Sequence, residues 1–360
     1  MKKKFERVFT LLLAALLVVS MAGCGGTPSE PPGEEGNDGG GETVVIRVNS
    51  AFNSATVDET ANGIAALEFV DRVAERTNGA YEIKLFMDSQ LGGSTDQIVG
   101  GLQTGAFEMC TKAVGDFGEF TDAFMPFNFP YLYSSPEVVH AIIDGPVGDR
   151  IRQDCIDDLG IRVLAFTELG YRHVTNSKHP IKTPDDMKGL KIRTMNDPYQ
   201  IAAMEALGAA VTPMSYSEVF TSLQTKVIDG QENPLGIITG NKFEEVQSYC
   251  TLTEHVYTPY YVVMNQAKWD SLTAEQQEAL TKAIEETTQR QYELSQQYED
   301  EAIEVMEGAG CAVRTLTDEE KLGFKEAADK ANSLEAAKKI MYKPELADQM
   351  AAELEAYRNK

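Results

Sequence analysis

The segment GLKIRTMNDP, residues 189–198, contains an arginine whose role can be read in two ways. If the segment is a strand, its side chains alternate between two faces, with Ile192 on one face and Lys191 and Arg193 on the other. Arg193 could face water beside Lys191, as most arginines do. It could instead face a cleft and hold an anion, because a guanidinium offers a planar fork of donors that matches a carboxylate. The segment alone leaves both alternatives open.

No other group of residues in the sequence has the spacing of a catalytic or metal site. There is no H-E-x-x-H, no G-x-S-x-G, no Walker loop, and no G-x-G-x-x-G after a predicted strand. Neighbouring acids such as Asp185 and Asp186 are typical of solvated helix ends. We therefore predict a protein that is not an enzyme and uses no cofactor or metal. Its histidines, which lie in unrelated contexts, are His140, His173, His179 and His255.

The first residues have the features of a targeting segment. Four basic residues precede an apolar run, Val8 to Val19, that is shorter than a membrane span. The run ends in SMAGC, which resembles the lipobox at which bacteria cleave a chain and lipidate its cysteine. We expect residues 1–23 to be a lipoprotein signal peptide and Cys24 to carry a lipid anchor. Ordinary secretion, with Cys24 incidental, is the alternative.

Residues 24–42 contain glycine, proline and acids but no apolar residues to form a core, so we expect a flexible linker. The whole chain of 360 residues carries a formal net charge of −24. The signal segment holds four bases and one acid, a net +3, so the mature form is near −27. This charge argues against nucleic acid or anionic lipid surfaces as partners.

Four cysteines remain after Cys24, widely separated and without a C-x-x-C pair. Export permits disulfides, but the spacing does not reveal whether any form. We expect them mainly to be small buried hydrophobic residues. They are Cys110, Cys155, Cys250 and Cys311.

Apolar periodicity in the first half of the chain predicts alternating strands and helices. Strand, helix and strand at the start form a β-α-β unit, the building block of a parallel sheet covered by helices. The expected strands are residues 43–50, 80–86, 107–111 and 161–166, and the expected helices are residues 57–77, 94–103, 136–144 and 146–159.

The pattern starts again after TPDDMKG. One helix begins with Asp197 as N-cap and Pro198 at its first position, and another with a capping box of Ser215 and Glu218. A third, residues 273–307, is long enough to span two lobes. The expected strands are residues 190–195, 209–214 and 260–265. The fold class is therefore α/β, with two sheet-based lobes.

The stretch GLKIRTMN, followed by ALGAAVTPMSYSEVFTSLQTKVIDGQENP, resembles the substrate-binding proteins of tripartite ATP-independent periplasmic (TRAP) transporters, of the dicarboxylate-binding (DctP) type. Further matching pieces are ERTNGAYEIKLFMDSQLGG, FNFPYLY and YRHVTNSKHPIKTPDDMKGLKIR. Each piece is weak alone, but their number and order cover nearly the whole mature chain.

The resemblance implies a two-lobed periplasmic-binding-protein-like (Venus flytrap) fold that closes around a small organic acid and is braced by a long helix. The chain would cross between the lobes near Glu168 and near Tyr257. Lobe I would then comprise residues 43–167 plus about 258–290, and lobe II residues 168–257 plus about 291–360.

The resemblance also implies ligand-binding residues. Arg193 in KIR would bind the ligand carboxylate, and Asn233 in GQENP would be a second anchor unless it only caps its own turn. Arg172 in GYRHVTNS could reach the ligand, and exposed pairing with acids of this very acidic chain is the alternative. Asn196 could make a polar contact, or it could simply flank the helix that begins at Asp197.

Four further residues are weaker candidates. Tyr216 in SYSEVF stands where the family commonly has an aromatic floor, although a core contact is the alternative. Lys112 could bind a second carboxylate, Glu168 could bind hydroxyls, and Asn49 could line the cleft. The sequence TELGYR lacks an aromatic residue that many members carry, and the first loop, NSAFNSATVDET, matches no ligand class. The far end of the ligand is therefore undetermined.

The sequence thus predicts an extracytoplasmic receptor for a C4-dicarboxylate or a sugar acid. It would be held by lipid on the outer face of the cytoplasmic membrane, at the cell surface or in the periplasm, and would deliver its ligand to TRAP membrane subunits. No contact with nucleic acid is expected, and contact with membrane only through the anchor. The same fold serving an ATP-driven importer or a sensor is one alternative. A secreted hydrolase or lyase is another, although no nucleophile or base is evident for it.

Overall fold

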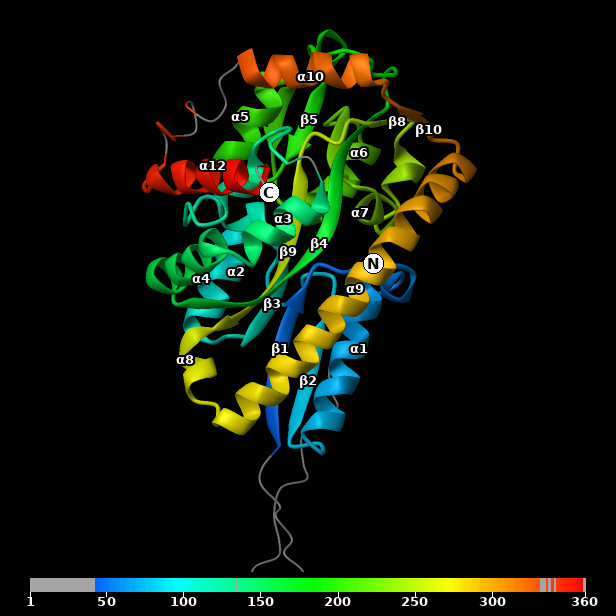
Figure 1. Ribbon diagram of the computed structural model, residues 1–360. Coiled ribbons are helices and arrows are strands. Elements are labelled where there is room, and N and C mark those ends of the chain that lie inside the picture. The colour runs from blue at the N-terminus through cyan, green and yellow to red at the C-terminus, as the bar shows by residue number, and fades with distance from the viewer. Residues whose placement is uncertain (1–42, 134, 331–334, 336–337, 340, 359–360) are drawn as a thin grey trace, which may run out of the picture. The chain divides into compact units, whose positions relative to one another are not determined.

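The computed structural model describes residues 43–133, 135–330, 335, 338–339 and 341–358. The predicted signal segment, the linker and Cys24 lie outside these residues. Within them, strands and helices alternate along most of the chain, and the predicted α/β class is confirmed (Figure 1).

Ten strands of the described chain form one mixed sheet, with the main order β2-β1-β3-β9-β4-β7-β5-β6. β1 is parallel to β2 and β3, and β5 is parallel to β6 and β7, whereas β9 runs antiparallel to β3 and β4. β8 pairs with β4 and β10 with β8. The strands are β1 Val44–Ser50, β2 Tyr81–Phe86, β3 Met109–Ala113, β4 Ile161–Asn176, β5 Lys191–Thr194, β6 Ala210–Pro213, β7 Gly230–Pro234, β8 Tyr249–Leu252, β9 Tyr257–Asn265 and β10 Ala312–Thr315.

β4 joins two groups of strands. One group is β1, β2, β3 and β9, and the other is β5, β6, β7, β8 and β10. Its first part, up to Tyr171, pairs with β9, and its last part, from Arg172, pairs with β7 and then also with β8. The register against β9 shifts between Glu168 and Gly170, just before the chain passes from one group to the other after Tyr171. The strand has 16 residues and is much longer than the predicted 161–166, because polar residues in its second half are buried and paired there.

The helices cover both groups of strands. α9 has 35 residues and begins at a capping box of Thr273 and Gln276, close to its predicted start. It contacts α1 along its first part and α7 and β10 along its second part (Figure 1). The helices are α1 Ala61–Arg76, α2 Thr95–Thr104, α3 Pro136–Ile143, α4 Pro146–Leu159, α5 Pro198–Ala206, α6 Val219–Gln224, α7 Leu235–Gly240, α8 Gln266–Asp270, α9 Ala274–Gly308, α10 Asp318–Lys330 and α12 Glu345–Arg358.

Several hydrophobic cores lie between the helices and the sheet. One packs α1 and the start of α9 against β1 and β2. Another joins α3, α4 and α12 to β4 and β9, so the C-terminal helix packs on α3 and α4. A third lies under α5 and α10, and a fourth under α6, α7 and the end of α9.

Two local predictions differ from the structure. The helix expected over 57–77 is interrupted at Thr60, whose backbone is extended and whose side chain accepts a hydrogen bond from the Gly63 amide. α1 therefore begins at Ala61, after a single 3-10 turn at Val57–Glu59. In addition, the GQENP motif forms the buried strand β7, which the sequence pattern did not predict.

The four cysteines of the described chain are free and buried. The predicted role as small hydrophobic residues therefore holds for these positions. Among the described residues, no helix combines the length and the apolar character that a membrane crossing requires.

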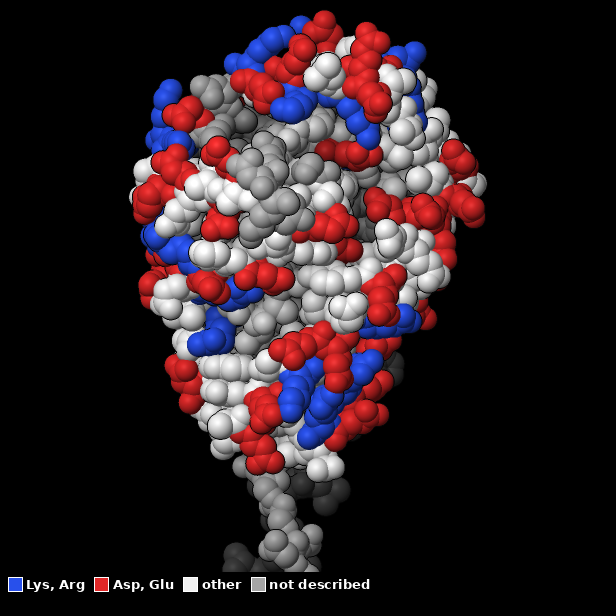
Figure 2. Space-filling model, in the orientation of Figure 1, with Lys and Arg blue, Asp and Glu red and all other residues white. Residues whose placement is uncertain are grey.

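The surface reflects the acidic composition. Figure 2 shows acidic side chains scattered from top to bottom of the visible face, with basic side chains gathered among acidic ones over α1 and α9. There Arg72 and Arg76 pair with Glu286, and Arg290 pairs with Glu68. These exposed pairs tie α9 to α1, and each contributes at most about 1 kcal/mol.

Candidate ligand-binding site

A cavity of about 670 Å³ lies where the two groups of strands meet. This is within the size range of sites for small organic molecules. Residues 51–53 and 56–62 of the first loop and α1 line it, together with parts of β4, β5, β7, β9, α3 and α9. Five of the predicted ligand-binding residues line the cavity: Lys112, Glu168, Arg193, Tyr216 and Asn233.

Arg193 reaches the cavity from β5 and is only 1% exposed. Its Nε and Nη2 atoms donate to the Met214 carbonyl at 3.1 and 2.8 Å, which fixes the plane of the guanidinium. Its Nη1 atom is buried and has no partner among the described residues. Burial lowers the pKa of Arg193 to about 10. A fixed cation with an unused donor at a cavity wall is suited to bind an anion.

Lys112, Asp116 and Tyr216 lie at the same end of the cavity. The Lys112 ammonium, whose side chain is 4% exposed, is 3.8 Å from the Asp116 carboxylate. The Tyr216 ring lies 5.9 Å from the Arg193 guanidinium carbon, and its hydroxyl is buried without a partner among the described residues. Burial raises the pKa of Tyr216, so its hydroxyl stays a neutral donor.

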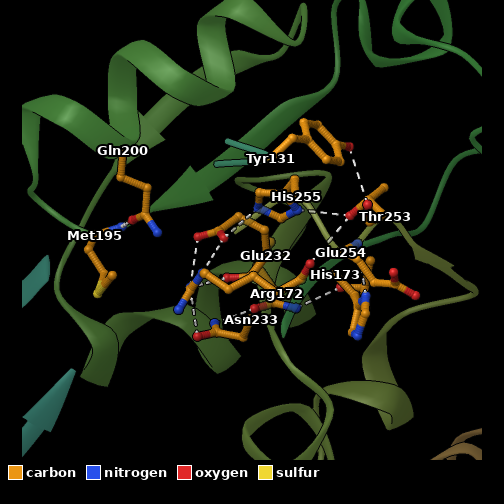
Figure 3. A network of polar contacts seen from close by, with 12 residues as sticks. Tyr131, Arg172, His173, Met195, Gln200, Glu232, Asn233, Thr253, Glu254 and His255 are labelled. Atoms are coloured by element: carbon orange, nitrogen blue, oxygen red, sulfur yellow. Dashed lines mark hydrogen bonds and ion pairs between the residues drawn. The ribbon is translucent and has the colours of Figure 1, made fainter. Parts of the chain in front are cut away.

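Asn233 and Arg172 are joined by a buried polar network (Figure 3). The Arg172 guanidinium binds both oxygens of the Glu232 carboxylate, and its Nη2 atom also donates to Asn233 Oδ1 at 2.9 Å. Asn233 Nδ2 donates to Gln231 Oε1. The amide therefore has a fixed orientation, and the second N–H of Nδ2 makes no hydrogen bond within the described chain, so it could serve a ligand in the cavity.

Glu232 is held from a second side by His255 (Figure 3). The His255 Nε2 atom is 3.1 Å from the Glu232 carboxylate, and its Nδ1 atom is 2.8 Å from the Thr253 hydroxyl. Burial acts to raise the pKa of Glu232, but Arg172 and His255 outweigh it and hold that pKa below its usual value. The ion pair is thus charged although it is fully buried.

Glu168 lies at another part of the cavity wall, at the register shift of β4. It accepts a hydrogen bond from the Tyr257 hydroxyl, and His140 Nε2 is 3.4 Å from the same carboxylate oxygen, Oε2. The His140 ring stacks on Tyr292 with centroids 4.6 Å apart. Gln291 on α9 exchanges hydrogen bonds with the Glu168 backbone. The carboxylate is therefore positioned by β4, β9, α3 and α9.

Three predicted residues are not among those that line the cavity. Arg172 is enclosed by Glu232 and Asn233. The Asn49 amide donates to the Gly92 carbonyl and accepts from the Leu91 amide, so it holds a turn. Asn196 is half-buried beside the N-terminus of α5, where Asp197 caps the helix. None of these three residues lines the cavity, although the Arg172 Nη1 atom is also buried without a partner among the described residues. Direct ligand contact by them stays a prediction.

Sequence reasoning also missed residues that line the site. Asp116 could have been noticed, because it follows Lys112 at a spacing of four residues. His140 and Tyr257 carried no local signal, since only the fold brings them to Glu168. Among the residues that the structure describes, no three His, Cys, Asp or Glu side chains form a group that could hold a metal ion.

The family described as "Bacterial extracellular solute-binding protein, family 7" (DctP) matches residues 52–339 of this chain. The chain belongs to this family. Its members are binding proteins for solutes and not enzymes, and they work outside the cytoplasm, as the sequence predicted.

Relatives of this family 7 protein bind different acids. The 2,3-diketo-L-gulonate-binding periplasmic protein YiaO of Escherichia coli is 38% identical over 276 residues, which are 77% of this chain and 83% of YiaO. The C4-dicarboxylate-binding periplasmic protein DctP of Rhodobacter capsulatus is 32% identical over 79% of this chain and 84% of its own.

The structure of the family 7 protein is similar to a solved complex. The sugar acid binding protein DctPAm of Advenella mimigardefordensis, crystallised with galactonate, superposes with a TM-score of 0.81 at 28% identity. The match covers 87% of this chain and 98% of the other. The predicted two-lobed fold with a long helix is confirmed by this similarity.

Proposed function

We propose that this protein captures a small organic acid anion, a C4-dicarboxylate or a sugar acid, and delivers it to the membrane subunits of a TRAP transporter. The observation that carries the proposal is Arg193, a buried guanidinium at the cavity wall whose Nη1 atom has no partner among the described residues. A ligand carboxylate would supply the missing acceptor, and a charged hydrogen bond of this kind is worth about 1.5–3 kcal/mol. The acids named for the relatives agree with this ligand class.

The other proposed contacts come from residues that line the cavity. Lys112 and Tyr216 supply donors beside Arg193, and Asn233 supplies its free N–H. Arg172 acts through Asn233, because it holds the amide oxygen of that residue. Direct contacts by Asn49 and Asn196 are not included in this proposal.

Movement of two lobes would give the cavity its closed state. We propose lobe I as residues 43–167, about 258–290 and 345–358, and lobe II as 168–257 plus about 291–344. The shift of β4 from one group of strands to the other near Glu168 supports the first boundary. The contacts of α12 with α3 and α4 do not support the predicted allocation of all of 291–360 to lobe II, so we assign α12 to lobe I.

Lipid attachment at Cys24 is proposed from the sequence alone, since that residue lies outside the described part of the chain. Cys24→Ser should release the protein from membranes while leaving ligand binding intact. Fractionation of cells that express the variant tests this, and continued membrane association of the variant would contradict it.

The ligand proposal is tested by thermal unfolding of the purified protein with a panel of small acids and matched neutral sugars. A ligand that binds only the folded state adds about 2.7 kcal/mol to the free energy of unfolding at a hundredfold excess over its Kd. We expect at least one acid to raise the melting temperature of the wild type. It should not raise that of Arg193→Lys, which keeps the charge but lacks the planar pair of guanidinium donors. If no acid shifts the wild type and mass spectrometry finds no ligand retained from purification, the proposal is wrong.

A further inference from the structure

The charges around the cavity are distributed unevenly. Seven carboxylates of the described chain line it, against two permanent cations, Lys112 and Arg193. Both cations lie near Asp116, which pairs with Lys112 and also acts on the pKa of Arg193. Two cations and one carboxylate leave this part of the site with a single net positive charge, enough to balance one carboxylate of a ligand.

The region around Glu168 has the opposite character. Glu299 on α9 and Glu137 on α3 also line the cavity, and of the described lining residues there only His140 could carry a positive charge. Glu299 is an exposed residue at the cavity lining, yet partial desolvation and then the charge of Glu168 raise its pKa. The Glu168 and Glu299 carboxylates therefore interact electrostatically across this region.

The donors and acceptors of this region suit hydroxyl groups. Glu168 Oε2 takes the Tyr257 hydroxyl, whereas Glu168 Oε1 makes no hydrogen bond within the described chain. A hydroxyl of a ligand could donate to Oε1 and accept from a ring nitrogen of His140. A carboxylate in the same place would be repelled by Glu168 and Glu299.

Resting on the function proposed above, we infer that the ligand is a monocarboxylate with several hydroxyl groups, a sugar acid, and that the site discriminates against C4-dicarboxylates. The carboxylate binds at Arg193 and Lys112, and the hydroxylated chain extends to Glu168 and His140. Lys112 does not provide for a second carboxylate, because Asp116 already balances its charge. Repulsion between Glu168 and the second carboxylate of a dicarboxylate makes the site discriminate against dicarboxylates.

Calorimetric titration of ligand-free protein with galactonate, succinate and the neutral galactitol tests this inference. We expect galactonate to bind at least a hundredfold more tightly than succinate, and galactitol to bind weakly or not at all.

Glu168→Gln should weaken galactonate binding and reduce the ratio of the galactonate and succinate affinities at least tenfold. If Glu168→Gln fails to fold, Glu299→Gln should still lower the ratio, since it removes a charge from an open position on α9. Glu293→Gln, an exposed position of the same helix outside the cavity lining, should leave the ratio unchanged.

The outcomes separate this inference from the proposed function. Succinate binding as tightly as galactonate, with both affinities lost in Arg193→Lys, would overturn the sugar-acid assignment but keep an anion receptor. Affinities that do not depend on Arg193, or equal binding of galactitol, would overturn the proposed function and this inference with it. An unchanged ratio in both glutamate variants would overturn the role given to Glu168.

Discussion

Arg172 and Glu232 form a two-pronged ion pair in which both side chains are 0% exposed. The pair lies beside Asn233, which lines the cavity (Figure 3). Desolvation of two charges is costly, but once the pair is formed, loss of one partner leaves the other buried without compensation. The stability of this region therefore depends on the two residues together.

Glu232→Gln should destabilise the fold by about 3–5 kcal/mol, because it leaves the Arg172 cation without a counter-charge in the interior. Urea denaturation measures the change. The control is Glu278→Gln, which removes an exposed partner of Lys282 and should cost no more than about 1 kcal/mol. Equal losses for the two variants would mean that the buried pair contributes little.

The two buried arginines should respond oppositely to replacement by methionine. Arg193→Met removes a desolvated cation whose hydrogen bonds within the described chain go only to the Met214 carbonyl, so the free energy of unfolding of the ligand-free protein should stay the same or rise. Arg172→Met leaves the Glu232 carboxylate buried without its arginine partner and should lower the free energy of unfolding by about 3–5 kcal/mol. The same denaturation experiment compares both variants. A large loss for Arg193→Met would show that its contacts to Met214 outweigh its desolvation.

Asp197 should make the fold less stable as pH rises from about 4 to about 7. Burial raises the pKa of this carboxyl to about 7 from its usual value of 3.8. Between these values the folded chain holds more protons at Asp197 than the unfolded chain does, so rising pH favours unfolding. The loss of stability caused by ionising the buried Asp197 carboxyl is absent below about pH 4 and complete above about pH 7.

Asp197→Asn keeps a good N-cap for α5 and removes this titration. Its free energy of unfolding relative to wild type should increase from pH 4 to pH 7 by at least about 1 kcal/mol, since each pKa unit corresponds to about 1.4 kcal/mol. Asp185→Asn, at an exposed position, serves as the control. A difference that does not change with pH would contradict the assignment.

Two adjacent glycines of α2 should respond oppositely to alanine. A Cβ at Gly100 meets nothing within 4 Å, so Gly100→Ala should stabilise the protein by up to about 1 kcal/mol through helix propensity. A Cβ at Gly101 would lie 2.3 Å from the buried Phe107 ring, so Gly101→Ala should be destabilising by about 1–3 kcal/mol. Thermal unfolding of both variants measures the contrast, and similar melting temperatures would be inconsistent with it.

The sequence predicts those elements best whose local signals are strong. α9 was expected at 273–307 and spans Ala274–Gly308, because its cap and its apolar periodicity agree. β7 was missed because the strand GQENP has no β-branched residues and is buried on both faces. Its polar groups are paired by β4 and neighbouring side chains, which no local pattern reveals.

Some residues of the site were likewise predicted from local motifs, whereas others could not be. The motif pointed to Arg193 and Asn233, and the alternative that Arg193 faces water is wrong, since that side chain is buried. The contact of Arg172 with Glu232 could not be predicted, because it depends on the register of β4 against β7. His140 reaches Glu168 on β4 from the separate helix α3. Such partners are set by tertiary packing and carry no spacing signal.

The four buried thiols have a consequence for experiments on this protein. Burial raises the pKa of each, to about 12 for Cys110 and about 11 for Cys311, so none offers a reactive thiolate near neutral pH. Cys110 and Cys155 belong to the core under α3, α4 and α12, and Cys250 and Cys311 to the core under α6 and α7. An alkylating reagent followed by peptide mass spectrometry would therefore report separately on the opening of two cores, with no label to be engineered.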